Sequence, residues 1–225
     1  MLRIILALVV VNVIVWSAVG ILLHFHSALI SSAILSYTLG LRHALDADHI
    51  SAIDLITRRL VASGDKPVTV GLFFSLGHST IVIVTSIVVA ATSGALSSRF
   101  QGFQQVGGII GTSVSATALV LLGAANAWIL YTLVRNLKLV LHNQQPGQVS
   151  LGPKAAIFSK IFRVIDRPWK MFPLGVLFGL GFDTSSEIAL LGLASVQGAQ
   201  GTSIWLILIF PALFTAGMCL IDTTG

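Results

Sequence analysis

The sequence predicts an all-α fold, a polytopic transmembrane helix bundle with six spans. Of its 225 residues, 55% are hydrophobic and only 9% are charged, whereas an ordinary soluble domain has about 25% charged residues. The apolar residues form runs close to the roughly 20 residues that a helix needs to cross a bilayer. Strands of a membrane barrel would be about 10 residues long and would alternate apolar with polar residues. The sequence lacks that alternation.

Polar breaks divide the chain into six apolar segments, expected at roughly 4–23, 29–54, 68–91, 107–134, 173–196 and 203–223. The first is longer than the 7–15-residue apolar core of a signal peptide, so we expect it to be retained as a span. The fourth begins with the small-residue stretch GGIIGTSVSATA, which favours close helix packing. The second, third, fifth and sixth contain polar motifs. Residues 1–225 are therefore predicted to form a single transmembrane domain.

A basic loop is expected between the fourth and fifth spans, at about 142–172. It begins with NQQPGQ and continues with the basic, aromatic stretch FSKIFRVIDRPWK. It could be an interfacial amphipathic piece or a mobile linker. In neither case do we expect this loop to bind a metal or to take part in catalysis.

The basic residues indicate the topology. A cytoplasmic N-terminus places eleven of the 13 on the cytoplasmic side: Arg3, Arg58, Arg59, Lys66, Arg135, Lys138, Lys154, Lys160, Arg163, Arg167 and Lys170. Because cytoplasmic loops are enriched in Lys and Arg, this orientation is favoured. The net charge of +5 therefore indicates topology rather than a nucleic-acid partner. We expect an integral protein of the bacterial inner membrane.

The acidic residues lie where a soluble surface would not place them. Six of the eight fall within or at the end of predicted spans: Asp46, Asp48, Asp54, Asp183, Glu187 and Asp222. A charge near the bilayer centre costs about 2.5–3.5 kcal/mol on insertion scales. We therefore expect these side chains to face one another or a polar cavity.

The second span contains the most polar stretch, LGLRHALDADHI at 39–50. On an ideal helix, an arc of roughly 140° holds five of its polar residues: Arg42, His43, Asp46, His49 and Asp54. Asp48 would point to another side, so it either bonds a different neighbour or the helix is broken, for example after Gly40. Discontinuous helices recur at membrane ion sites.

Three other spans contribute polar residues. The third has His78 in FSLGHST, as a ligand or as a hydrogen-bonded packing residue. The fifth has Asp183 and Glu187 at i,i+4, where a cation or protons could lie between them, or one proton could be shared. The sixth has Asp222 one turn after Met218, a soft ligand or a packing residue.

Imidazole and carboxylate together suit divalent first-row metals such as nickel, cobalt, zinc or iron, whereas magnesium and calcium prefer oxygen ligands. Such ligands on several spans, without a soluble catalytic domain, favour a transporter over an enzyme. The metal is then the transported substrate, and no cofactor is expected. Because binding needs neutral imidazole and ionised carboxylate, metal loading should release protons and weaken in acid.

Four motifs resemble the signatures of the NiCoT family of nickel/cobalt permeases. RHALDADHI (42–50) is similar to the first, with Leu45 in place of the usual Val or Phe. FSLGHSTIVIV (74–84) resembles the second, LGFDTSSE (180–187) the third, and GMCLIDTTG (217–225) the start of the fourth. The motifs occur in the family's order over almost the whole chain.

The resemblance implies secondary-type uptake of trace Ni²⁺ or Co²⁺ by a single polypeptide, without an ATPase subunit, in a bundle of about eight helices. It assigns metal recognition to His43, Asp48 and His49, and Asp46 also matches the motif. It assigns supporting polar roles to His78, Asp183, Glu187 and Asp222. The chain departs from the family in having six predicted spans, and Gly225 replaces an Asp. It therefore resembles a shortened family member.

Three alternatives remain at this point. One is a related nickel/cobalt efflux permease, because the spacing of the ligands does not encode direction. Another is an HxxxxD membrane acyltransferase, with His43 as the base, but this leaves the GHST and DTSSE motifs unused. The third is a metal-sensing or nonfunctional remnant. Nickel and cobalt suit the same ligands.

Overall fold

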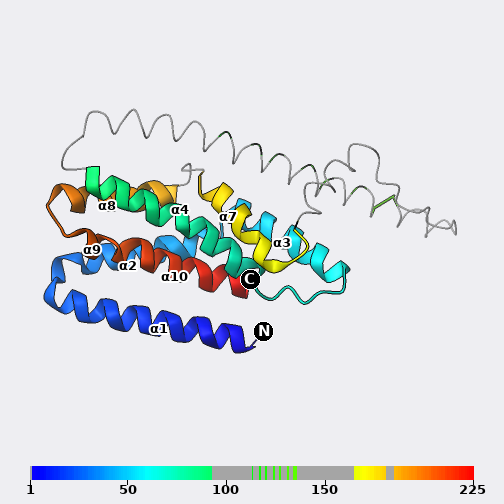
Figure 1. The fold of residues 1–225 in the computed structure, drawn as a ribbon, viewed down its shortest axis with the longest axis horizontal. Coiled ribbons are helices and arrows are strands. Elements are labelled where there is room, and N and C mark those ends of the chain that lie inside the picture. Colours follow the sequence, from blue (N-terminus) through cyan, green and yellow to red (C-terminus); the bar gives the residue numbers. More distant parts are fainter. Residues whose placement is uncertain are drawn as a thin grey trace.

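The computed structural model describes residues 2–92, 165–180 and 185–225, together with eight helical residues between 113 and 135. Every regular element in these parts is helical, and none of the described residues forms a strand. The elements are α1 (Leu2–Phe25), η1 (Ser27–Leu29), α2 (Ile30–His43), α3 (Ala47–Ala62), α4 (Val70–Thr92), η2 (Pro168–Lys170), α7 (Met171–Gly179), α8 (Ser185–Ala199), α9 (Ile204–Ile207) and α10 (Ile209–Thr224). The longer helices lie side by side along one axis (Figure 1).

Three of the described helices are long and apolar enough to cross a membrane. They are α1, α4 and the stretch Ile204–Thr224, which joins α9 to α10. They coincide with the first, third and sixth predicted spans, so helices at these places are confirmed. The fourth predicted span, 107–134, lies outside the described residues except for scattered helical positions, and so does the basic loop up to residue 164.

The second predicted span is two helices rather than one. α2 ends at His43, and α3 begins at Ala47 and continues to Ala62. Between them the chain turns, with the Asp46 N–H donating to the His43 carbonyl at 2.9 Å. Asp46 takes the extended N-cap conformation, and Asp48 lies in the first turn of α3, where a carboxylate favours the helix dipole. Of the two alternatives for this span, the broken helix is the one found, with the break after His43 rather than after Gly40.

The fifth predicted span is also divided. α7 ends at Gly179 and α8 begins at Ser185, while residues 181–184, including Asp183, lie outside the described residues. α7 and α8 follow one another along the bundle, as α2 and α3 do (Figure 1). The helical structure also begins inside the predicted loop 142–172, at η2. There Lys170 donates to Asp166 at 2.7 Å and lowers the pKa of this carboxyl.

Glycines allow the central helices to approach closely. A Cβ on Gly77 of α4 would collide with the Phe172 carbonyl of α7, and a Cβ on Gly175 of α7 would collide with the Phe74 carbonyl of α4. Gly40 of α2 lies in the same way against the α10 backbone. Small residues at helix contacts serve this purpose in membranes, where packing rather than water drives association. Polar side chains on these helices are thereby brought within reach of one another.

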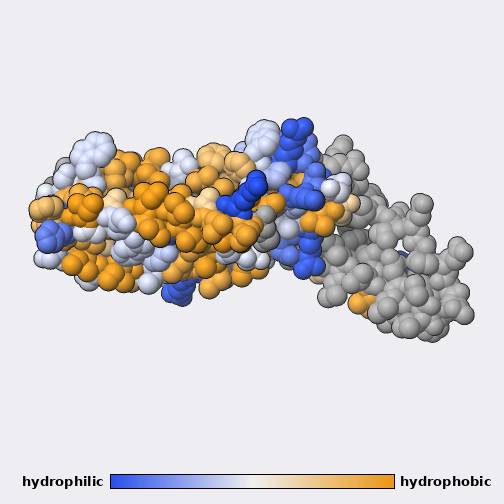
Figure 2. Space-filling view, turned by 90° about the horizontal axis from the view of Figure 1, so that it is seen from below, coloured by the Kyte–Doolittle hydropathy of each residue, from blue (hydrophilic) through white to orange (hydrophobic). Residues whose placement is uncertain are grey.

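Two apolar clusters form the core. One joins α1, α2, α4, α8, α9 and α10 and includes Phe210 and Phe214. The other joins α3, α4 and α7 and includes Ile56 and Phe74, so α4 contributes to both. Outside the core, α1 exposes large apolar side chains such as Val10 and Ile14. Most of the coloured surface in Figure 2 is hydrophobic. An apolar exterior of this kind is expected of a protein that faces lipid.

The Gly175→Ala variant should destabilise the fold. Its methyl group has no room against the α4 backbone, and overpacking of this kind typically costs about 1–3 kcal/mol. Gly192→Ala is the matched control, because a Cβ at Gly192 of α8 meets nothing within 4 Å. Thermal unfolding of the purified protein in detergent should show a lower midpoint for Gly175→Ala only. Equal midpoints for the two variants would contradict the packing described.

Candidate metal centre

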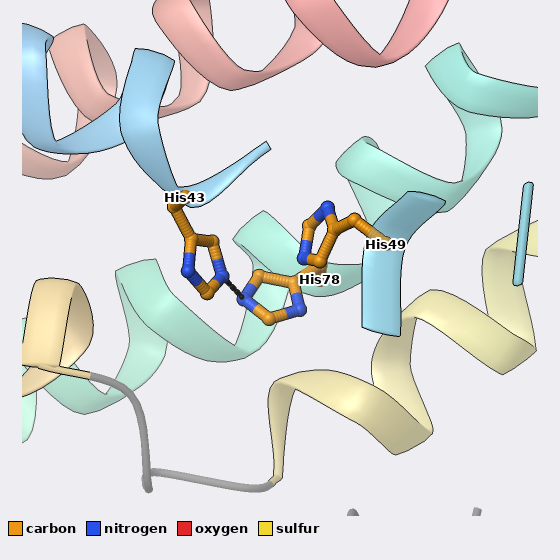
Figure 3. A group of neighbouring side chains, drawn as sticks. All are labelled: His43, His49 and His78. Atoms are coloured by element: carbon orange, nitrogen blue, oxygen red, sulfur yellow. Dashed lines mark hydrogen bonds between the residues drawn. The ribbon is translucent and has the colours of Figure 1, made fainter. Parts of the chain in front are cut away.

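Three buried histidines from three helices converge in the core. His43 is the last residue of α2, His49 lies in the first turn of α3, and His78 lies within α4. Their exposed fractions are 0%, 0% and 1%. One ring nitrogen from each can be chosen so that all lie within 4.8 Å of one another. Figure 3 shows the three rings turned toward a common space.

The helix break brings His43 and His49 together. On a continuous helix, residues six apart would be separated by about 9 Å along the axis. The turn between α2 and α3 instead leaves their ring centroids 4.6 Å apart. His78 completes the group, with its Nε2 at 3.0 Å from His43 Nε2. The site therefore depends on the interruption of the second predicted span after His43.

Two carboxylates hold the outer nitrogens of two of these rings. Asp46 Oδ2 lies 3.0 Å from His43 Nδ1, and Asp222 Oδ2 of α10 lies 3.0 Å from His49 Nδ1. A neutral imidazole that donates Nδ1–H to a carboxylate keeps its lone pair on Nε2. Carboxylates placed in this way orient histidine ligands at many metal sites and make them more basic.

A third carboxylate belongs to Glu187, in the first turn of α8. Its Oε1 lies 3.0 Å from His78 Nε2, and its side chain is 1% exposed. His49 Nε2 and His78 Nδ1 are buried and have no hydrogen-bond partner among the described residues. Buried polar nitrogens without partners are rare in folded proteins. These two atoms could therefore serve as ligands.

The charges of the site favour a cation. If the imidazoles are neutral, Asp46, Asp222 and Glu187 supply three negative charges around the histidines. Buried charges of one sign repel strongly in a medium of low dielectric constant. A divalent cation among the imidazoles would offset two of them. Nitrogens that share one ion at about 2.1 Å lie roughly 3–4 Å apart, so the cluster needs little movement to bind one.

Other predicted residues lie elsewhere. Arg42 is exposed, and Asp54 forms an i,i+4 ion pair with Arg58 at 2.8 Å. The prediction that they share a polar face with His43 is wrong. Asp54 follows the break after His43, which changes the direction of the helix, whereas Arg42 precedes the break and is exposed next to the buried His43 on α2. Asp48 is half-buried next to His49 but is not part of the three-histidine group. Asp183 lies outside the described residues.

The sequence reasoning missed Ser75. Its hydroxyl contacts Asp222 Oδ2 at 2.5 Å and the Gly71 carbonyl at 2.9 Å. It lies three residues before His78 in the same motif, a spacing that places both side chains on one side of a helix. That spacing was the available signal. Phe74 packs against His49, with ring centroids 4.8 Å apart, and Phe214 against His43, at 5.3 Å, so apolar rings enclose the site.

Comparison with known proteins identifies the family. The model of the family described as "High-affinity nickel-transport protein" (NicO) matches residues 29–225. The "High-affinity nickel transport protein" of Cupriavidus necator is 44% identical over 223 residues, which cover 96% of this chain and 64% of that protein. The Helicobacter pylori strain 26695 protein "High-affinity nickel-transport protein NixA" is 37% identical over 219 residues, 92% of this chain and 66% of the relative.

A third relative is named for cobalt. The "Cobalt transport protein NhlF" of Rhodococcus rhodochrous is 38% identical over 208 residues, 87% of this chain and 58% of that protein. The chain thus spans about half to two thirds of the length of the curated relatives it matches. No solved structure gives a significant match. The matched family is one of transporters rather than enzymes, so the acyltransferase alternative is not favoured. The chain belongs to the NicO family of high-affinity nickel-transport proteins.

Proposed function

We propose that this chain is a secondary-type transporter that takes up Ni²⁺ or Co²⁺ through the three-histidine site. The observation that supports this most directly is the convergence of His43, His49 and His78 in the apolar core. Imidazole favours first-row transition metals over magnesium and calcium. Relatives named for nickel and for cobalt agree with either ion as substrate.

The proposed architecture is one transmembrane domain with six crossings. Two of the crossings are discontinuous, α2 with α3 and α7 with α8, and the fourth corresponds to 107–134. Irregular backbone within a membrane is tolerated where protein buries it or where it lines a cavity. Broken helices that meet near the midplane are a recurring way of building transport sites. We place the protein in the bacterial inner membrane. By the positive-inside rule, its N-terminus and the basic loop 142–172 then lie on the cytoplasmic side.

The proposed cycle follows from the enclosure of the site. A hydrated ion exchanges water for imidazole nitrogens, with Asp46, Asp48, Asp183, Glu187 and Asp222 as acidic partners along its path. The histidines are almost completely buried, so the ion can enter or leave only when helices around the site move. The break between α2 and α3 is a place where such movement would be absorbed. Neither an ATPase subunit nor a cofactor is part of this proposal.

Uptake of trace Ni²⁺ and Co²⁺ in competition tests the proposal. Cells that express the chain should accumulate one or both metals above cells with an empty vector, and an excess of the preferred ion should suppress the other. Lowered cell nickel would instead identify the efflux alternative. Binding without flux in reconstituted vesicles would identify the sensing or nonfunctional alternative.

A further inference from the structure

We infer that Ser75 is a positioning residue for metal binding, acting through Asp222 on His49. The inference rests on the proposed metal site. In this inference, Ser75 holds the Asp222 carboxylate in the orientation in which the carboxylate accepts a hydrogen bond from His49 Nδ1–H. His49 then presents the lone pair of Nε2 to the metal.

The three residues form a buried chain across three helices. Ser75 of α4 is 0% exposed, and the side chains of Asp222 and His49 are 1% and 0% exposed. Asp222 Oδ2 lies 2.5 Å from the Ser75 hydroxyl and 3.0 Å from His49 Nδ1. The same carboxylate oxygen therefore receives both donors.

The backbone of α4 sets up this contact. A Cβ on Gly71 would collide with the main-chain carbonyl of Asp222, so the end of α10 lies directly on α4. Ser75 follows Gly71 by four residues and lies one helical turn further along the same side. Its hydroxyl thus meets the Asp222 side chain where the two backbones are closest.

The single hydroxyl proton of Ser75 has two oxygen acceptors within hydrogen-bond distance. The Gly71 carbonyl lies at 2.9 Å and the Asp222 carboxylate at 2.5 Å. Hydrogen bonds to an ionised acceptor are shorter and roughly twice as strong as neutral ones, so the proton belongs to Asp222. A buried carboxylate needs such donors to remain charged and in one orientation. Without Ser75, Asp222 is free to turn away from His49.

Nickel affinity of the purified full chain in detergent tests the inference. Ser75→Ala should weaken nickel binding by about tenfold, the lower end of the 10–100-fold that loss of an outer-shell partner costs. Ser75→Cys, with a weak donor of similar size, should fall between Ser75→Ala and the unmodified chain. Ser86→Ala is the matched control, because Ser86 is also 0% exposed on α4. Its affinity should stay within about twofold of the unmodified chain.

A double-mutant cycle separates positioning from packing. In an Asp222→Ala background, Ser75→Ala should weaken nickel binding no further, because the residue through which it acts is gone. A purely structural role would give the same loss in both backgrounds and would overturn the inference. So would an unchanged affinity of Ser75→Ala beside an unmodified chain that binds nickel. If the unmodified chain binds neither nickel nor cobalt, the proposed function itself fails, and the inference with it.

Discussion

His49→Ala is expected to abolish nickel binding and uptake by this chain. The loss should exceed the roughly 10–100-fold that removal of an outer-shell partner costs, because a ligand itself is removed. His49 is the ring whose Nε2 is buried and has no hydrogen-bond partner among the described residues. The substitution also leaves Asp222 facing an empty space in the core. Nickel titration of the purified chain and uptake of trace nickel by expressing cells would measure the two effects.

The matched control is His26→Ala. His26 is exposed at the N-cap of η1, at the opposite end of α2 from His43. This variant loses the same chemical group without touching the core, so its affinity should equal that of the unmodified chain. Thermal unfolding without metal would separate loss of a ligand from loss of the fold. A folded His49→Ala protein with unchanged affinity would remove His49 from the site.

Glu187→Gln is expected to weaken nickel binding by about 100-fold, the second largest effect. The substitution keeps the size of the side chain and removes one charge next to His78. Unit charges 4 Å apart attract by about 4 kcal/mol at an effective dielectric constant of 20. A neutral Gln costs less to bury than a carboxylate, and this offsets part of the lost attraction. The remaining loss of nickel affinity is about 100-fold, or roughly 2.7 kcal/mol.

Asp54→Asn provides the comparison for Glu187→Gln. It also removes one carboxylate charge, but Asp54 is half exposed and pairs with Arg58 on the surface of α3. Exposed pairs of this kind contribute little to stability, and Asp54 does not belong to the three-histidine group. Nickel affinity should therefore be unchanged in this variant. Equal losses of nickel affinity in the two variants would mean that the net charge of the protein governs binding, and that the position of Glu187 next to His78 does not.

The helical fold and several residues of the three-histidine cluster could be predicted from the sequence. The length of the apolar segments predicted the helices α1, α4 and α9–α10. The free-energy cost of placing charge in lipid indicated that His43, His49 and their acidic neighbours face one another. These inferences depend only on the types of residue present and on the lengths of the continuous apolar segments. They need no knowledge of how one helix lies against another.

A break in the second span was one of the alternatives, but its position after His43 was harder to predict. A uniform advance of about 100° per residue placed Asp54 on the same face as His43, but the turn after His43 resets the helical phase for every residue of α3. A local signal existed, since Asp46 is a favoured N-cap residue and Asp48 follows in the first turn. The contact of Ser75 with Asp222 depends on α4 and α10 meeting at Gly71. Such a long-range contact is not encoded by spacing within a single helix.

X-ray absorption spectroscopy of the nickel-loaded chain tests the central claim most directly. Histidine ligation predicts the multiple-scattering pattern of two or three imidazoles around the ion. This pattern should weaken in His43→Ala. It should be absent in His49→Ala, because that variant no longer binds nickel. A nickel environment of oxygen atoms alone would contradict the claim that His43, His49 and His78 hold the transported metal. An imidazole signal unchanged in both variants would contradict it equally.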